Sequence, residues 1–389
     1  MFSAFRSLRN PLSLVWAAML TLLLAGCQVA APVIGAGPRP TGQTVDVAML
    51  LPLSSQQGGD AIIARSLSNA AQMAADEQSG VVVNVELYDT GGNPSQAANV
   101  ARQAVQEGAD VILGPLRSDA AAAVGVAVAN SGIAVLSFSN NTEVAGGNVF
   151  VIGQTFGNTA DRIISYAARQ GRGNIVLVHA SNLAGEVARD AARRAAARSG
   201  ATIAASIPYD FSQTGVIDAV PRVVEAVEQT EANALLLTSD SAGALPFFAQ
   251  LLPENGLDTE AVRVMGLTRW DLPPQTLEFA GLQGGWFALP DPGAVSTFEA
   301  RYAATYGTAP HNLAALGYDG MRAIVETAAG SGRVGPAALA ASGGFDGANG
   351  AFRLLPDGTN RRALAIAQVI DNQVAIIDPA PRRLGAAGF

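Results

Sequence analysis

Residues 45–53 read VDVAMLLPL, a nearly unbroken apolar run that ends in a Pro-Leu step. Apolar residues then recur at spacings of three and four over residues 62–74 (IIARSLSNAAQMA), and residues 81–87 (VVVNVEL) form a second apolar, β-branched run. Short apolar runs are typical of buried strands, and apolar residues at helical spacing are typical of one face of an α-helix. This stretch therefore predicts a strand–helix–strand unit whose parallel strands are covered on both faces.

The same alternation continues along the chain, with a second helical spacing at residues 97–105. We predict eight further strands at Asp110–Leu113, Ile133–Ser137, Val149–Ile152, Asn174–Val178, Thr202–Ile207, Ala234–Thr238, Val262–Met265 and Gly285–Leu289. The first series ends near Ser137 and a new series begins after Gly153, so we expect two open α/β sheets in tandem. Residues 44–379 are too many for one compact core and suit two lobes. Ligands of such sheets bind beyond the carboxyl ends of the strands, which predicts a cleft between the lobes.

The carboxyl third of the chain changes in pattern. Pro310–Thr327 predicts one helix. Antiparallel strands are then predicted at Gly350–Leu355, Ala363–Ile370 and Gln373–Ile377, with turns at Asp357-Gly358 and Asp371-Asn372. Residues 379–389 are expected to form a loose tail.

The amino-terminal residues indicate export. Arg6 and Arg9 precede an apolar run, Pro11–Gly26, that ends at Cys27, the only cysteine in the chain. This order is typical of a secretory signal, and the run is too short for a spanning helix. Residues 24–27 (LAGC) resemble a bacterial lipobox, which implies a lipid on Cys27 and a cleaved segment 1–27. Gln28 after the cysteine implies sorting to the outer membrane, and residues 28–43, rich in Ala, Pro and Gly, predict a flexible tether in the periplasm.

The charge and the motifs that are missing exclude several functions. The chain has 24 basic and 32 acidic residues and a formal net charge of −8, which argues against nucleic acid as a partner. There is no Gly-x-Ser-x-Gly elbow, His-Glu-x-x-His pair or phosphate loop. The two histidines, His179 and His311, are far apart, and no Cys/His cluster suggests a metal. We therefore predict no enzyme activity, no catalytic residues, no metal and no cofactor.

Several segments together resemble the type I periplasmic-binding family, in particular its branched-chain amino-acid binding proteins. They are residues 45–53, 86–90 (ELYDT), 107–116 (EGADVILGPL), 132–137 (GIAVLS) and 345–358 with Phe345-Asp346-Gly347, Phe352-Arg353 and Asp357-Gly358. The resemblance implies an α/β fold of two Rossmann-like lobes with parallel sheets, joined by a three-segment hinge. It implies that lobe 1 comprises residues 44–153 and 290–345, and lobe 2 residues 154–289 and 346–378.

Candidate ligand residues in lobe 1 follow from the same resemblance. Relatives hold a carboxylate with hydroxyl and backbone N–H groups at helix N-termini, where the helix dipole favours an anion. The matching residues after the predicted strands are Ser54, Ser55, Arg117, Ser118, Ser139 and Asn141. Serine and asparagine are also common helix caps, so each of them has a structural alternative; for Ser118 the two roles are equally supported.

Lobe 2 departs from the relatives. Its candidate ligand residues are Asn182, Thr268, Arg269 and Trp270, but Ala184 stands where relatives have a tyrosine. Relatives also place an acid just after a strand that ends in Met-Gly, here Met265-Gly266, to meet the ligand ammonium. Asp271 is the nearest acid in this chain, and no acid is well placed. An unpaired buried ammonium costs several kcal/mol, so the cleft should disfavour a free amino acid and suit an anion, or no ligand. Trp270 could stack on a ring, although a lobe-interface role is favoured.

The lipobox and Tyr88-Asp89-Thr90 resemble the carboxyl-terminal domain of lipoprotein activators of penicillin-binding proteins. That branch implies a non-enzymatic regulator of peptidoglycan synthases on the outer membrane. The alternative is the solute receptor of an ABC-type transporter for an amino acid or a small anion, which would deliver its ligand to a membrane permease. An envelope enzyme is the third and weakest hypothesis.

Overall fold

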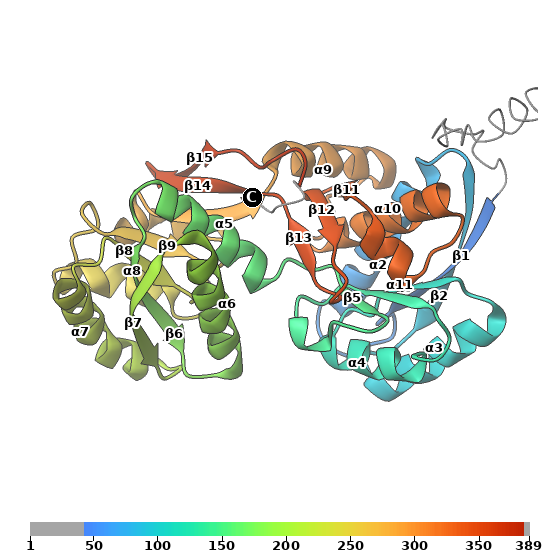
Figure 1. Cartoon of the computed structure of the whole chain (residues 1–389), viewed down its shortest axis with the longest axis horizontal. Coiled ribbons are helices and arrows are strands. Elements are labelled where there is room, and N and C mark those ends of the chain that lie inside the picture. The colour runs from blue at the N-terminus through green and yellow to red at the C-terminus, as the bar shows by residue number, and fades with distance from the viewer. Residues whose placement is uncertain (1–42, 385–389) are drawn as a thin grey trace, which may run out of the picture. The chain divides into compact units, whose positions relative to one another are not determined.

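The computed structural model describes residues 43–384, which belong to one compact unit. Lobe 1 is built on a parallel sheet in the order β2-β1-β3-β4-β5 (Figure 1). Its strands are β1 (Gln43–Leu51), β2 (Val81–Asp89), β3 (Val111–Leu113), β4 (Ala134–Ser137) and β5 (Val149–Val151). Its helices are α2 (Asp60–Asp76), α3 (Pro94–Glu107), α4 (Ser118–Ala127), α9 (Pro292–Tyr306), α10 (Ala314–Ser331) and α11 (Pro336–Ala341).

Both faces of this sheet are covered, as the apolar run at residues 45–53 predicts. Val47, Met49 and Leu51 of β1 pack with helices α2 and α10. Ala48 and Leu50 point to the opposite face and pack with α3 and α4. Because successive side chains of a strand alternate between faces, a strand between two helix layers must be apolar throughout.

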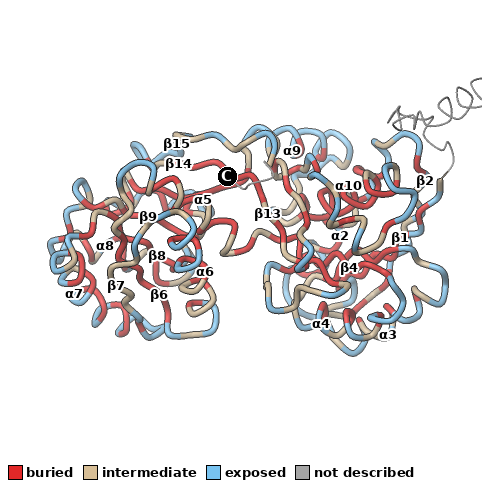
Figure 2. Tube along the Cα trace, in the orientation of Figure 1, coloured by how far each residue is buried: buried red, intermediate tan, exposed pale blue. Residues whose placement is uncertain are grey.

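Lobe 2 is built on a second sheet in the order β15-β14-β10-β9-β8-β6-β7. The parallel strands are β6 (Asn174–Ala180), β7 (Thr202–Tyr209), β8 (Ala234–Leu237), β9 (Arg263–Gly266) and β10 (Trp286–Pro290). The antiparallel strands β14 (Leu364–Ile370) and β15 (Gln373–Asp378) extend the sheet beyond β10. Helices α5 (Phe156–Arg169) and α6 (Leu183–Ser199) cover one face, and α7 (Gln213–Thr230) and α8 (Leu245–Glu254) cover the other. Figure 2 shows the buried strands at the centre of both lobes and the exposed outer faces of the helices.

The ten strands predicted before residue 290 are confirmed, with each end within two residues of its predicted position. The helix predicted at Pro310 begins later, at Ala314, because His311 Nδ1 accepts the Leu313 N–H and forms a turn. The strands predicted over 350–377 are confirmed as β12 (Gly350–Leu354), β14 and β15. The predicted turn at Asp371-Asn372 is confirmed, with φ angles of 50° and 63°.

The predicted lobe boundary at residues 345–346 is wrong. Strands β11 (Phe345–Gly347), β12 and β13 (Asn360–Arg362) form a separate three-stranded sheet. Phe345, Phe352 and Leu354 of this sheet are buried in the core of lobe 1. The last passage of the chain into lobe 2 therefore lies between β13 and β14, because the apolar side chains of the hairpin find their partners in lobe 1.

Within residues 43–384, no helix combines the length and the apolar character needed to cross a bilayer. The predicted signal segment, Cys27 and almost all of the tether lie outside the described residues, as do residues 385–389 of the predicted tail.

Candidate ligand-binding cleft

A cleft of about 950 Å³ lies at the carboxyl ends of the lobe 1 strands. Its lobe 1 wall includes the predicted residues Arg117, Ser118, Ser139 and Asn141. From lobe 2 the cleft is lined by Arg269 and Leu272, in the loop after β9. Five of the ten residues predicted to bind a ligand therefore line one cleft, as expected for side chains that follow parallel strands.

Helix α4 begins at this cleft without a side-chain cap. Arg117 occupies the cap position with extended backbone, and Ser118 is the first helical residue. The interpretation of Ser118 as a cap is therefore wrong. Asp119 Oδ1 accepts the N–H of Ala120 at 2.8 Å. The positive end of the helix dipole and the hydroxyl of Ser118 are thus available to an anionic group in the cleft.

Arg117 is tied to an acid that the sequence analysis missed. Its Nη2 donates to Asp60 Oδ1 at 2.7 Å, and Asp60, the first residue of α2, is 2% exposed. The second oxygen, Oδ2, is also buried and has no hydrogen-bond partner among the described residues. Burial by itself raises the pKa of Asp60, but Arg117 and the neighbouring Ser55 hydroxyl outweigh it, and the pKa lies below its ordinary value. Asp60 is therefore a carboxylate, and it lines the cleft together with Asp119.

Two acids therefore line the cleft from lobe 1, whereas none lines it from the lobe 2 loop after β9, where relatives place the acid that meets the ligand ammonium. An aspartate at the first position of a helix usually faces solvent and complements the helix dipole, so its type and place did not distinguish it. The buried ion pair with Arg117 comes from the packing of α2 against the start of α4, which brings together residues far apart in the sequence.

The lobe 2 loop after β9 holds Arg269 against Asp271. Arg269 Nε donates to Asp271 Oδ1 at 2.9 Å, and its Nη2 bonds the other carboxylate oxygen. Asp271 itself does not line the cleft. Trp270, between them, is fully buried in the lobe 2 core, with its ring 5.6 Å from that of Phe287. The predictions that Trp270 stacks on a ligand ring or lies at the lobe interface are both wrong, because the indole is enclosed by its own lobe.

The remaining predicted residues do not line the cleft. Ser54 donates its backbone N–H to the Asp89 carboxylate, and Ser55 Oγ accepts the N–H of Gln57. Asn182 caps α6 by accepting the N–H of Gly185 at 2.9 Å, and Thr268 donates its hydroxyl to the carbonyl of Ser239. For Asn182 the structural alternative, a helix cap, accounts for the residue.

Amide side chains form much of the cleft wall and were mostly missed. Besides Asn141, they are Gln57, Asn140, Gln154, Asn312 and Asn349. No spacing motif marks them, because they come from five different segments. Each amide offers both donors and an acceptor, so the cleft can match a strongly polar solute.

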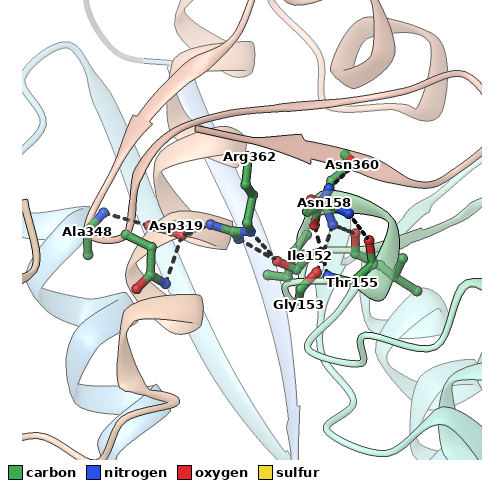
Figure 3. Close-up of polar contacts among 10 residues, drawn as sticks. Ile152, Gly153, Thr155, Asn158, Asp319, Ala348, Asn360 and Arg362 are labelled. Carbon is green, nitrogen blue, oxygen red and sulfur yellow. Dashed lines mark hydrogen bonds and ion pairs between the residues drawn. The ribbon is translucent and has the colours of Figure 1, made fainter. Parts of the chain in front are cut away.

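The cleft is bordered by the chain segments that pass between the lobes. Gly153, Gln154, Pro290 and Asn349 belong to or adjoin these segments. Figure 3 shows the polar network there: Arg362 lies between Asp319 and the carbonyl of Ile152, with Arg362 Nη1 2.7 Å from Asp319 Oδ2. Asp319 and Arg362 are 0% and 2% exposed.

The network extends to the start of lobe 2. Asn360 donates to the carbonyls of Val151 and Gly153, and its own carbonyl accepts from Asn158, which forms a capping box with Thr155 at the start of α5 (Figure 3). Asp319 also accepts the Ala348 N–H. The first and last interlobe segments are therefore bonded to each other and to α10, as a hinge requires.

The model of the periplasmic binding protein family matches residues 44–373. The chain belongs to this family. Among solved structures, a branched-chain amino acid ABC transporter protein from Rhodospirillum rubrum is 19% identical, with 86% of this chain and 100% of that chain covered and a TM-score of 0.71. A search of curated proteins finds no match.

Two further similar structures carry ligands. An ABC transporter substrate-binding protein from Desulfitobacterium hafniense in complex with Leu is 18% identical (86% and 100% covered, TM-score 0.62). An ABC transporter solute-binding protein from Rhodopseudomonas palustris in complex with 3,4-dihydroxybenzoic acid is 19% identical (87% and 96% covered, TM-score 0.59). At these identities the likeness establishes the two-lobed α/β fold of this periplasmic binding protein, and the chemistry of its cleft must be argued from its own residues.

Proposed function

We propose that this periplasmic binding protein is the solute receptor of an ABC-type uptake transporter. The observation that carries the proposal is the cleft itself: about 950 Å³, at the carboxyl ends of the strands, with polar groups from several segments converging on it. Pockets of this volume suit small molecules. Several similar proteins are ABC transporter substrate-binding proteins, which supports the same function.

Lobe 1 offers a site for an anionic group of the solute. The uncapped start of α4, the Ser118 hydroxyl and the Arg117 guanidinium border the same cleft. Arg117 is held in place by Asp60, so less side-chain entropy is lost when a ligand binds. A carboxylate accepted here would receive charge-assisted hydrogen bonds in addition to the helix dipole.

The hinge would allow the lobes to close on the solute. Its first and last segments are bonded to lobe 1 through Asn360 and Arg362. Closure would then bend the segments just beyond these bonds, near residues 153–155 and 363, and would bring Arg269 towards lobe 1. The solute would make additional contacts in the closed state only. Solute binding would therefore shift the population towards the closed state.

We propose that the receptor is exported to the periplasm and is anchored by a lipid on Cys27, with Gln28 favouring the outer membrane. Regulation of peptidoglycan synthases, the function first favoured by the sequence, stays a prediction. It rests on the amino-terminal signal, on Tyr88-Asp89-Thr90 and on a cleft that departs from the amino-acid site of the relatives, whereas several similar structures are ABC transporter substrate-binding proteins. The absence of enzyme activity follows from the proposed receptor role.

A thermal-unfolding screen tests the proposal. The full chain, solubilised in detergent, would be heated with amino acids, amides, aromatic acids and small mono- and dicarboxylates. A bound solute at a hundredfold excess over its Kd stabilises the fold by about 2.7 kcal/mol, enough to raise the midpoint by several degrees. Arg117→Gln should reduce the shift by about half or more, because a tenfold loss of affinity leaves about 1.4 kcal/mol of stabilisation at the same ligand concentration, while Arg198→Gln, on the exposed surface of lobe 2, should preserve it. A panel that leaves the midpoint unchanged at millimolar concentrations contradicts the proposal.

A further inference from the structure

The lobe 2 side of the cleft is dominated by one charged group. Two residues of the loop after β9 line the cleft from lobe 2. Arg269 is charged and Leu272 is apolar. The Arg269 side chain is 31% exposed, while its partner Asp271 is 15% exposed. Arg269 therefore lines the cleft and is the more exposed member of the pair, whereas Asp271 does not line the cleft.

Asp271 occupies only one edge of the Arg269 guanidinium. The Nε and Nη2 atoms bond its two oxygens, and Nη1 has no hydrogen-bond partner among residues 43–384. A guanidinium has five N–H donors in a fixed plane, so donors remain for a second acceptor. The bidentate pair sets the plane in which that acceptor must lie.

The loop that carries Arg269 is held at three points. Thr268 Oγ1 lies 3.0 Å from the Ser239 carbonyl, and Ser241 Oγ lies 2.6 Å from the Leu272 carbonyl. Between them the Trp270 ring packs directly on Gly266, where an added Cβ would lie 2.3 Å from the indole nitrogen. The loop therefore presents Arg269 as a preorganised group and not as a mobile surface side chain.

Arg117 repeats this arrangement in lobe 1. One of its nitrogens bonds Asp60, its Nη1 has no partner among the described residues, and its side chain is 37% exposed. Asp119, the other acid of the cleft, is exposed, and one of its oxygens is engaged by the N–H of Ala120. The two lobes thus each bring one buttressed guanidinium to the same cleft.

We propose that the solute carries two acidic groups, one for Arg117 and one for Arg269, as a short dicarboxylate does. The inference rests on the proposed receptor function and adds the ligand class. A cationic group opposite Arg269 would meet a like charge, and a neutral group would make weaker hydrogen bonds than a carboxylate. The acidic group that meets Arg269 binds fully only when the lobes close.

The test uses ligands of matched shape that differ in charge. Isothermal titration of the detergent-solubilised full chain would compare succinate, succinamate and succinamide, with the corresponding glutaric and adipic series to vary the length. At the best chain length the dianion should bind at least about tenfold more tightly than the half-amide, and the half-amide more tightly than the diamide. A half-amide that binds as tightly as its dianion at every length overturns the inference.

Variants locate the second acidic group. Arg269→Gln should weaken the dianion at least about tenfold and leave the half-amide within about twofold, because the half-amide makes no ion pair there. Asp271→Asn keeps the guanidinium and should affect both ligands by less. If Arg269→Gln weakens the affinities for the dianion and the half-amide equally, the role of Arg269 is purely structural and the proposal is contradicted. Binding of a monoanionic or neutral solute alone would sink this inference and leave the receptor function standing, whereas the absence of any binding would remove both.

Discussion

Two arginine–aspartate pairs of equal length serve different regions of this protein. Arg362–Asp319 at the hinge and Arg117–Asp60 at the cleft are both 2.7 Å apart. The hinge pair is fully enclosed, with Arg362 also bonded to Ile152 and Asp319 to Ala348. In the cleft pair the Arg117 side chain is 37% exposed, and some of its N–H donors have no partner among the described residues. The satisfaction of the remaining N–H donors, and not the length of the ion pair, therefore separates a structural pair from a binding group.

Breaking the hinge pair should have the largest effect. Asp319→Asn leaves the Arg362 charge buried without its counter-charge and should lower the free energy of unfolding by about 3–5 kcal/mol. Urea denaturation followed by circular dichroism measures it. Arg198→Gln, which removes the exposed pair with Asp161, is the matched control and should cost less than about 1 kcal/mol. Similar losses in the two variants would mean that burial does not distinguish the pairs.

Breaking the cleft pair should cost less stability and more binding. Arg117→Gln leaves Asp60 buried and should lower the free energy of unfolding by about 1–3 kcal/mol. Because the arginine also contacts the solute in our proposal, ligand affinity should fall by about tenfold or more. Titration calorimetry and urea denaturation of one preparation separate the two effects. A stability loss as large as that of Asp319→Asn would show that the cleft pair is structural.

The pH dependence should differ between the two pairs. The pKa of Asp60 lies below its ordinary value of 3.8, so the ion pair stabilises the fold fully above about pH 4 and loses this contribution as the pH falls through the lowered pKa. Burial raises the pKa of Asp319 and the Arg362 guanidinium opposes that rise, so the hinge pair is not expected to show the same loss on acidification as the Asp60 pair.

Urea denaturation between pH 7 and pH 3 tests this difference. The stability gap between the native chain and Asp60→Asn should stay constant from pH 7 to about pH 4.5 and narrow below pH 4. A gap that already narrows between pH 6 and pH 5 would contradict a lowered pKa for Asp60.

The smallest effect is expected at Asp119. This acid is the second residue of α4, beside the proposed anion site, and it is exposed. Asp119→Asn removes a like charge while its side-chain oxygen can still accept the N–H of Ala120, so affinity for an anionic solute should rise by two- to fourfold. The gain should shrink in 1 M salt, where exposed charges are screened. Unchanged affinity at low salt would place the anion away from α4.

Much of the candidate site could be predicted because it follows the strands. Ser118, Ser139 and Asn141 come directly after apolar runs, and parallel strands deliver such residues to one edge of a sheet. The same argument placed Trp270 at the cleft, although it is buried in lobe 2, and it did not identify Asp60, which lines the cleft. Their side chains are buried by partners from distant segments, Phe287 in one case and Arg117 in the other. A residue's type and its place after a strand do not reveal such partners.

The hinge was equally hidden. Asn360 and Arg362 are residue types usually found at the surface, yet they are 4% and 2% exposed. Helix α9 was also missed, because only Phe298 and Tyr302 of its 15 residues are buried and its apolar face is correspondingly thin.

Local sequence is enough to predict the alternation of strands and helices, the two sheets and the edge of each sheet at which polar residues gather. These features depend on local apolar periodicity, which any segment carries within itself. Long-range packing sets which lobe holds the closing hairpin, which acid pairs with Arg117, and which polar side chains are buried at the hinge. Those outcomes depend on contacts between segments up to hundreds of residues apart, and the burial that sets their energies exists only once the chain is folded.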